Sequence, residues 1–479
     1  MIIAKNTSIL LITDVISKIL LTILAIIIAR KLGASDLGLL AYAISFSAMF
    51  SFIPNCGFKN FINREVVKYP DKSGSYFSNL AFIKLILSLV TFFIISTSSY
   101  IIRLGHEQFI IVCIAALIMV IDSFIQFYTA FFRGFQRAEY EALTLISQNF
   151  LVSVTGILII CMGYGLLNMM IVRLLVTLTI FFLGFIVLKI KILNPPFNLH
   201  LSSCRTLLES AKPFIVLAIF GVINAHIGIV LLTQLKGTLY TGWYSAALKL
   251  CGIFQFIPTS VAGAVLPAMT KFSKNGNKTN LKKTFSKSFK YLLILLLPIA
   301  AGTTILADKI ILLIYNESFI HSILTLRILI WIVVLSFTNT IIRVAYLSID
   351  KERKYVRIQF LGTIINISLC FLLIPTLGHN GVAIALTSSE FIIFIFSVSY
   401  ISKYFIGSKV LSTGFKPIVA TMIMVIMIFS VPYFNLFIII PMAVLIYCLS
   451  LFMLKSFDDE DIAVFKTGIF KLLLVIRRN

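Results

Sequence analysis

Apolar segments of membrane-spanning length recur along the whole chain. A helix that crosses about 30 Å of hydrocarbon needs about 20 consecutive, mostly apolar residues. The pattern predicts fourteen such helices, at about residues 7–29, 37–57, 77–102, 108–132, 141–162, 166–188, 212–235, 239–262, 289–314, 322–342, 358–376, 380–402, 417–432 and 434–454. The sequence therefore predicts an all-α integral membrane protein.

One stretch of this pattern occurs twice. Residues 33–54 read GASDLGLLAYAISFSAMFSFIP, and residues 237–258, at an offset of 204, read GTLYTGWYSAALKLCGIFQFIP. A second, shorter echo relates Gly163–Leu166 to Gly378–Val382, again directly after an apolar run. Both echoes lie between apolar segments, so they indicate a duplicated membrane bundle and not a soluble repeat array.

The glycines of the repeat are predicted to be structural. Gly33 pairs with Gly237 and Gly38 with Gly242 at the same offset. Because glycine permits backbone conformations and close helix approaches that side chains obstruct, Gly33 and Gly237 are predicted to be equivalent turns. Each would join the first two helices of its half.

The spacing of the two copies predicts how the halves are related. The repeated segments are the second and the eighth, and an even separation gives both copies the same direction through the membrane. The predicted organisation is a six-helix bundle over residues 1–190, a cytoplasmic linker over 191–211 and a second six-helix bundle over 212–404. An extra helix pair over 405–456 and a cytoplasmic tail over 457–479 would follow.

The distribution of basic residues predicts the orientation. With the N-terminus inside, and with residues near a helix end counted with the adjoining loop, 31 of the 41 lysines and arginines fall in inside regions, 6 fall in outside loops and 4 fall deeper within predicted helices. Cytoplasmic loops of membrane proteins carry such an excess, so both termini are predicted to be cytoplasmic. The same rule accounts for the net charge of +23, and no nucleic-acid partner is expected.

Composition narrows the class further. The chain is 59% hydrophobic and 12% charged, whereas a soluble domain is about half apolar and about a quarter charged. These values leave no room for a large soluble domain. The seven cysteines form no metal-binding spacing and are interpreted as small apolar fillers. No cofactor or metal is expected.

The basic stretch Lys271–Lys290 has two interpretations. Leu281, Phe285 and Phe289 alternate with lysines, so the segment could lie on the anionic inner leaflet as an amphipathic helix. The alternative is a solvated loop that obeys the positive-inside rule.

Four motifs in register resemble a known family. They are ARKLG with the following DLG and Tyr42, FRGFQRAEY from Phe132, AKPF from Ala211, and IPTLGHNGVAIA from Ile374. They resemble the Wzx-type polysaccharide flippases, which belong to the superfamily of the lipid II flippases and the MATE drug exporters. The resemblance covers the first twelve predicted helices and makes Arg30, Gly33 and Gly38 part of the signature that closes the first helix.

The resemblance implies two six-helix bundles arranged as a V around a central cavity. It implies alternating access of an undecaprenyl-pyrophosphate-linked oligosaccharide, such as an O-antigen or capsule unit, from the cytoplasmic to the outer face of a bacterial inner membrane. It also implies membrane lipids, a polysaccharide polymerase and chain-length proteins as partners. A coupling ion, H⁺ or Na⁺, is left open.

Four cations within predicted helices are candidates for binding the substrate. Charges within a bilayer are costly unless they face a cavity or a partner, and a diphosphate crossing a low-dielectric region needs fixed positive charge. Lys249 has no acidic neighbour within a helical turn and is the main candidate, with Lys18 as its partner across the cavity. Arg173 is a third candidate. Lys84 is the fourth, with snorkelling toward the inner surface as the alternative.

The ionisable groups that could couple transport to an ion are Asp14, Asp122, Glu390 and His226. Asp14 lies four residues before Lys18 on one helix face, so these two side chains could instead neutralise each other. A lone helix histidine is more often packed than catalytic. Asparagines and glutamines within the helices could line a saccharide path or simply hold helices together.

Other function classes fit the sequence less well. A MATE-like exporter of cationic compounds would favour an acidic cavity, whereas the predicted helices carry four cations and three acids. A membrane-embedded polymerase or glycosyltransferase would need a large outer loop or clustered acidic motifs, and the predicted outer loops are short. The chain is therefore predicted to be a transporter and not an enzyme.

Overall fold

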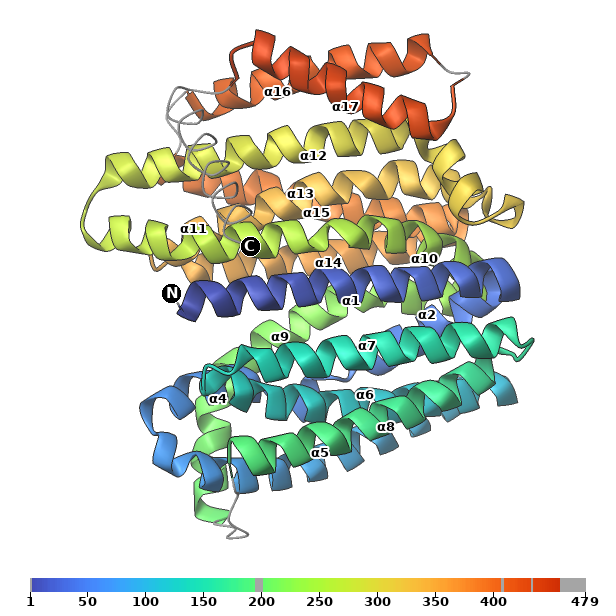
Figure 1. Ribbon diagram of the computed structural model, residues 1–479, viewed down its shortest axis with the longest axis vertical. Coiled ribbons are helices and arrows are strands. Elements are labelled where there is room, and N and C mark those ends of the chain that lie inside the picture. Colours follow the sequence, from blue (N-terminus) through green and yellow to red (C-terminus); the bar gives the residue numbers. More distant parts are fainter. Residues whose placement is uncertain (1, 194–200, 406–408, 432–433, 457–479) are drawn as a thin grey trace, which may run out of the picture.

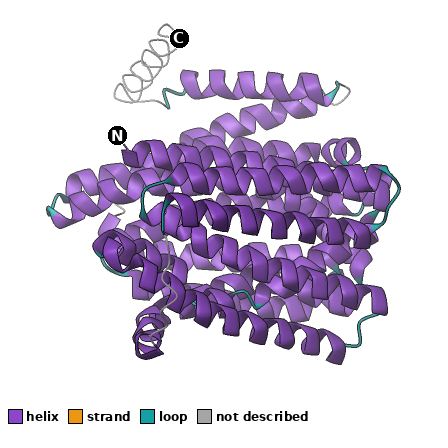
Figure 2. Ribbon diagram, turned by 60° about the horizontal axis from the view of Figure 1, so that its bottom comes forward, coloured by secondary structure: helices purple, strands orange, loops and turns teal. Residues whose placement is uncertain are grey.

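The chain folds into long helices joined by short turns (Figure 2). The computed structural model describes residues 2–193, 201–405, 409–431 and 434–456, and across these ranges the only regular elements are helices. The all-α class predicted from the apolar pattern is confirmed. The predicted tail over 457–479 lies outside the described residues.

The N-terminal half comprises eight α-helices and one short 3-10 helix. They are α1 (Ile2–Leu32), α2 (Ala34–Met49), α3 (Phe52–Asn55), α4 (Phe58–Lys68), η1 (Pro70–Lys72), α5 (Ser73–Ile101), α6 (His106–Gly134), α7 (Ala138–Cys161) and α8 (Leu166–Lys191).

The C-terminal half begins with α9 (Leu201–Lys236), whose start lies within the segment predicted to be a linker. The elements that follow are α10 (Thr238–Gly252), η2 (Ile253–Gln255), α11 (Phe256–Lys274), α12 (Lys278–Ile314), η3 (Glu317–Phe319), α13 (Ser322–Ser348), α14 (Glu352–Leu377) and α15 (His379–Phe405). The extra pair is α16 (Lys409–Ser430) and α17 (Leu436–Met453).

Each of the fourteen predicted segments coincides with helix. Three of them, at 37–57, 239–262 and 417–432, do not form one helix of full membrane-spanning length. Within the described residues, eleven helices are long and apolar enough to cross a membrane, while α2 and the apolar part of α16 are shorter. Segments 2 and 8 are broken at matching places: α2 ends at Met49 and α10 ends at Gly252, each shortly before the repeated proline. The duplication therefore extends to an interruption of the helix, which an unbroken apolar run does not reveal.

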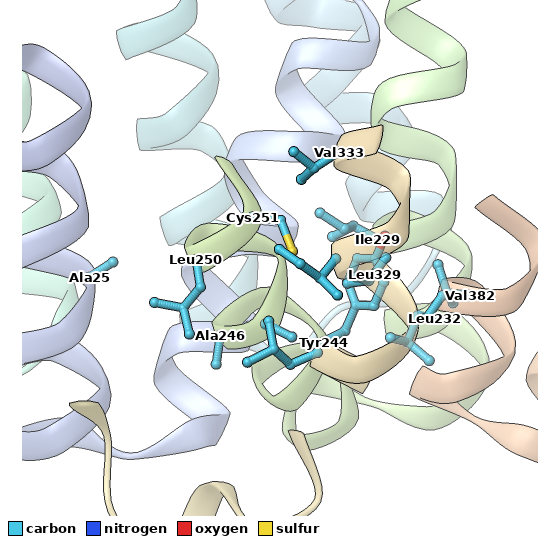
Figure 3. Close-up of a cluster of buried hydrophobic side chains, with 14 of the residues drawn as sticks. Ala25, Ile229, Leu232, Tyr244, Ala246, Leu250, Cys251, Leu329, Val333 and Val382 are labelled. Carbon is cyan, nitrogen blue, oxygen red and sulfur yellow. The ribbon is translucent and has the colours of Figure 1, made fainter. Parts of the chain in front are cut away.

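The two halves pack side by side (Figure 1). In this view α5–α8 lie below and α10–α15 lie above, with α1 and α2 between them and α16–α17 against α12 at the top, while α9 runs obliquely from the lower left toward α2 and α10. One apolar core extends over both halves and draws on α1, α2, α9, α10 and α13. Part of it is seen in Figure 3, where Tyr244 and Cys251 of α10 meet residues of α9 and α13, and Leu250 points toward Ala25 of α1.

The backbone repeats at the two turn glycines. Gly33 has φ 90° and ψ −177°, and Gly237 has φ 90° and ψ 176°. This region of the backbone map is adopted essentially only by glycine, since a side chain there costs of order 1–3 kcal/mol. The duplicated sequence thus encodes the same turn twice.

The basic segment Lys271–Lys290 is neither a free loop nor a separate surface helix. It forms the end of α11, a tight turn and the start of α12, so it is a helical hairpin (Figure 1). Leu281 and Phe285, which were expected to face lipid or solvent, are 7% and 1% exposed and belong to the main core. The apolar face of the segment therefore packs against protein, and Lys271, Lys274 and Lys278 remain exposed.

Candidate functional site

The two halves meet most closely where α2 crosses α10. A Cβ added at Gly38 would lie 2.6 Å from the Gly242 backbone nitrogen, and closer still to the Thr238 carbonyl oxygen. A Cβ at Gly242 would meet the Ala34 carbonyl group in the same way. The contacts are reciprocal, as at a two-fold axis, because Thr238 and Gly242 are the repeat equivalents of Ala34 and Gly38.

Polar contacts reinforce this end of the bundle, which we call the Gly33 end. Ser35 Oγ and Thr238 Oγ1 share a hydrogen bond of 2.8 Å, and Gln234 Nε2 donates to the Tyr42 hydroxyl at 2.6 Å. Arg30 Nε donates to the carbonyl of Ile314 at 2.7 Å, and its Nη2 donates to that of Leu313. Arg30 therefore caps the last carbonyls of α12, where a cation also complements the helix dipole.

Charges from both halves approach one another further from that end. Arg173 of α8 is attracted by Asp122 of α6 and repelled by Lys249 of α10. Gln148 Nε2 donates a hydrogen bond of 2.6 Å to Asp122 Oδ1. Asp122 and Arg173 are half-buried, whereas Lys249 is exposed on α10 between half-buried Leu248 and buried Leu250. Two of the predicted cations, one from each half, are thus brought within electrostatic reach.

The remaining predicted groups occupy separate places. Lys18 is half-buried on α1 and is attracted by Asp14, as their spacing predicted. His226 on α9 is half-buried, and its Nδ1 has no hydrogen-bond partner among the described residues.

Lys84 departs from both expectations. Its side chain neither snorkels nor lines a cavity, since the residue is only 1% exposed. The ammonium group donates to the Pro54 carbonyl at 2.8 Å and to Asn55 Oδ1 at 3.1 Å, and it lies 5.5 Å from the centroid of the Phe124 ring. Lys84 therefore fixes the break after α2 against α5 and α6, which is a structural role.

We expect Lys84→Met to destabilise the fold. The change leaves two acceptors at the end of α3 without their donor, and a buried unsatisfied polar group costs about 1–3 kcal/mol. The apparent unfolding temperature of the purified protein should fall by several degrees, whereas Lys189→Met, at the exposed end of α8, should leave it unchanged. Equal unfolding temperatures in the two variants would contradict the role assigned to Lys84.

A large pocket that contains several charged side chains lies within the C-terminal half. Its volume is about 980 Å³, and α9, α13, α14 and α15 form its walls. Its polar lining includes three arginines and two glutamates, namely Arg343, Arg353, Arg357, Glu352 and Glu390.

Glu390 is held in this pocket by Asn339. Asn339 Nδ2 donates to Glu390 Oε2 at 2.8 Å and to the Glu390 backbone carbonyl at 3.1 Å. Asn339 lies on α13 and Glu390 lies on α15, and these two helices pack along each other. Glu390, one of the predicted ion-coupling candidates, is thus part of a hydrogen-bonded pair facing the pocket.

Comparison with known proteins identifies the family. The model of the family described as "Polysaccharide biosynthesis protein" matches residues 3–273, more than half of the chain. The chain belongs to this family. The MatE family model also matches, over residues 213–372, so the second half carries the pattern of a related transporter family.

Two curated relatives extend over most of the chain. One, from Haloferax volcanii, is a probable low-salt glycan biosynthesis flippase, Agl15; it is 20% identical over 78% of each chain. The other, an uncharacterized membrane protein of Methanocaldococcus jannaschii, is 22% identical over 79% of this chain and 80% of its own length.

Solved structures show the same fold. The lipid II flippase MurJ in an inward closed conformation superposes with a TM-score of 0.79 at 15% identity, over 92% of this chain and 97% of that one. An inward-facing multidrug resistance MATE family transporter of the MOP superfamily gives 0.65 at 17% identity, over 81% and 95%. The expected superfamily fold is therefore confirmed.

Reasoning from the sequence missed the pocket arginines of this family member. Arg343, Arg353 and Arg357 were assigned to an inside loop and explained by the positive-inside rule. A usable signal was present, because Arg353 and Arg357 are four residues apart at the start of a helix and so share one face. The sequence did not indicate which neighbouring helices this face meets.

Proposed function

We propose that this protein is a flippase that moves a lipid-linked saccharide between the two faces of a membrane. The observation that carries the proposal is the approach of Arg173 and exposed Lys249 from opposite halves. Paired cations suit the diphosphate of a lipid-linked saccharide, whose desolvation they offset. The family membership supports the same substrate class.

The finer assignment is an undecaprenyl-pyrophosphate-linked oligosaccharide that crosses a bacterial inner membrane outward. Both termini are placed in the cytoplasm on the basis of the basic-residue count. The Gly33 end is then the outer end, and the contacts of Arg30, Gly38 and Gly242 would close it. Alternating access would require these contacts to separate, so with this orientation the conformation would be closed toward the outside.

A MATE-like exporter is the second candidate, because the MatE family model matches part of the chain. The two functions differ in the charge of the cargo. A cationic compound would be repelled by Arg173 and Lys249, whereas a diphosphate would be attracted. This charge pattern favours the flippase.

The proposal is tested by transport in a reconstituted system. The full-length protein is placed in liposomes with a fluorescent undecaprenyl-diphosphate-linked disaccharide, and a membrane-impermeant reductant measures the fraction of probe in the outer leaflet. We expect the protein to exchange the probe between leaflets faster than empty liposomes do. Transport of a cationic dye without movement of the lipid probe would refute the flippase and favour the exporter.

The orientation is tested by reporter fusions. The α8 end at Lys191 and the α11–α12 turn at Asn277 lie on the side of the N-terminus, opposite Thr238 (Figure 1). Fusions after Lys191 and Asn277 should therefore both report a cytoplasmic position, and a fusion after Thr238 should report the outside. A cytoplasmic signal after Thr238 would overturn the topology.

A further inference from the structure

The arginines of the C-terminal pocket are available to a ligand. Arg353 and Arg357 lie one turn apart on α14, and Arg343 faces the same pocket from α13. All three are exposed. Within the part of the chain that the structure describes, no guanidinium group of the three forms a hydrogen bond or an ion pair. Their donors can therefore engage an incoming anion, and guanidinium groups bind planar oxyanions in a bidentate manner.

Part of the remaining lining consists of groups that suit hydroxyls. They are Asn224, Asn339 and Gln359. Asn224 accepts from Asn366 Nδ2 at 2.9 Å, and Gln359 Nε2 donates to the Tyr355 hydroxyl at 2.9 Å. Each primary amide offers two donors and an acceptor, so these bonds leave hydrogen-bonding capacity for a polar ligand.

Asn339 provides an independent indication of a missing partner. The residue is only 2% exposed, and while its Nδ2 binds Glu390, its Oδ1 is buried with no hydrogen-bond partner among the described residues. A buried acceptor without a partner costs about 1–3 kcal/mol. A ligand hydroxyl that donates to Asn339 Oδ1 would remove this cost.

The charge of the lining selects the kind of anion. Three arginines are opposed by Glu352 and Glu390, so the pocket carries a small positive excess that matches a single negative charge. A diphosphate would bring more charge and would meet both glutamates. The glutamates accept hydrogen bonds readily from sugar hydroxyls, and a volume of about 980 Å³ is ample for a sugar unit.

We propose that this pocket binds an acidic sugar of the lipid-linked saccharide, with its carboxylate on the arginines and its hydroxyls on the amides and Glu390. The proposal rests on the proposed flippase function and adds the substrate class. The diphosphate interacts with Arg173 and Lys249, outside the lining of this pocket. The flippase is thus selective for saccharides that carry a carboxylate.

The test compares two probes in the full-length protein reconstituted into liposomes. Both are fluorescent undecaprenyl-diphosphate-linked disaccharides, one ending in glucuronic acid and the other in glucose, so they differ only in the carboxylate. Since a charge-assisted hydrogen bond contributes about twice as much as a neutral one, we expect at least about tenfold faster exchange of the glucuronic acid probe. Arg343→Gln with Arg353→Gln should abolish this preference, because exchange of the glucuronic acid probe should slow to the rate of the glucose probe in the same variant.

A matched control is Lys354→Gln, which removes one charge from the same turn of α14. Lys354 lies over the Tyr400 ring, 5.3 Å from its centroid, and is not among the pocket-lining residues, so the preference should persist. Equal exchange of both probes by the unmodified protein would overturn the pocket assignment and leave the flippase intact. Exchange of neither probe would reject the flippase and the pocket assignment with it.

Discussion

Gly38→Ala and Gly242→Ala are each expected to force the two halves apart. The added methyl group at either position would meet backbone atoms of the opposite helix, which cannot rotate away as a side chain can. Overpacking of this kind typically costs about 1–3 kcal/mol and occasionally more. The apparent unfolding temperature of each purified variant should therefore fall clearly.

The matched control is Gly252→Ala on the same helix, where an added Cβ would have no atom within 4 Å. Alanine is favoured over glycine in a helix by up to about 1 kcal/mol, so this variant should be as stable as the unmodified protein or more stable. The double variant with alanines at 38 and 242 should lose less than the two single losses combined, because one substitution already separates the helices. Unchanged unfolding temperatures in both single variants would disprove the close crossing.

The sequence predicted the turns at Gly33 and Gly237, but it did not predict the close crossing of α2 and α10. A glycine at the same point of two repeats implied a shared turn, since only backbone geometry explains a glycine there. The sequence did not indicate that the second repeated glycine pair would form the contact between the repeats. That contact depends on how the bundles pack, and a local pattern does not encode it.

Lys84 illustrates why charges within apolar segments are difficult to interpret. Its distance from the end of its segment suggested snorkelling or a cavity. The break after α2 exposes backbone carbonyls inside the bundle, and these need donors. The Lys84 ammonium group is such a donor, and it binds the Pro54 carbonyl. The helix break, which the apolar pattern concealed, therefore creates the need for this lysine.

The pocket in the C-terminal half shows the opposite error. Its arginines follow the positive-inside rule, so their number required no further explanation. Their function depends on α9, α13 and α15 closing around the start of α14. Side chains from four helices, from Phe220 of α9 to Glu390 of α15, form one site, and only the fold brings them together.

The substitution with the largest expected effect on transport is Lys249→Ala. The side chain is exposed on α10 and interacts with Arg173 of the other half, so its removal should not disturb packing. It should remove one charge-assisted contact to the diphosphate, which contributes about 1.5–3 kcal/mol, or about 10- to 150-fold in rate. Lys249→Arg should retain part of the activity, because the charge is kept although its geometry changes.

The measurement is surface polysaccharide display in a host that lacks its own flippase, with protein levels compared by immunoblot. Lys236→Ala removes an exposed lysine at the Gly33 end and should leave display unchanged. Lys18→Ala is less informative alone, because it leaves the Asp14 charge without its attraction. The double change Asp14→Ala with Lys18→Ala separates stability from transport. Full display by Lys249→Ala at normal protein levels would exclude an essential substrate-binding role for this lysine, and the flippase proposal would then depend on Arg173 and the family membership.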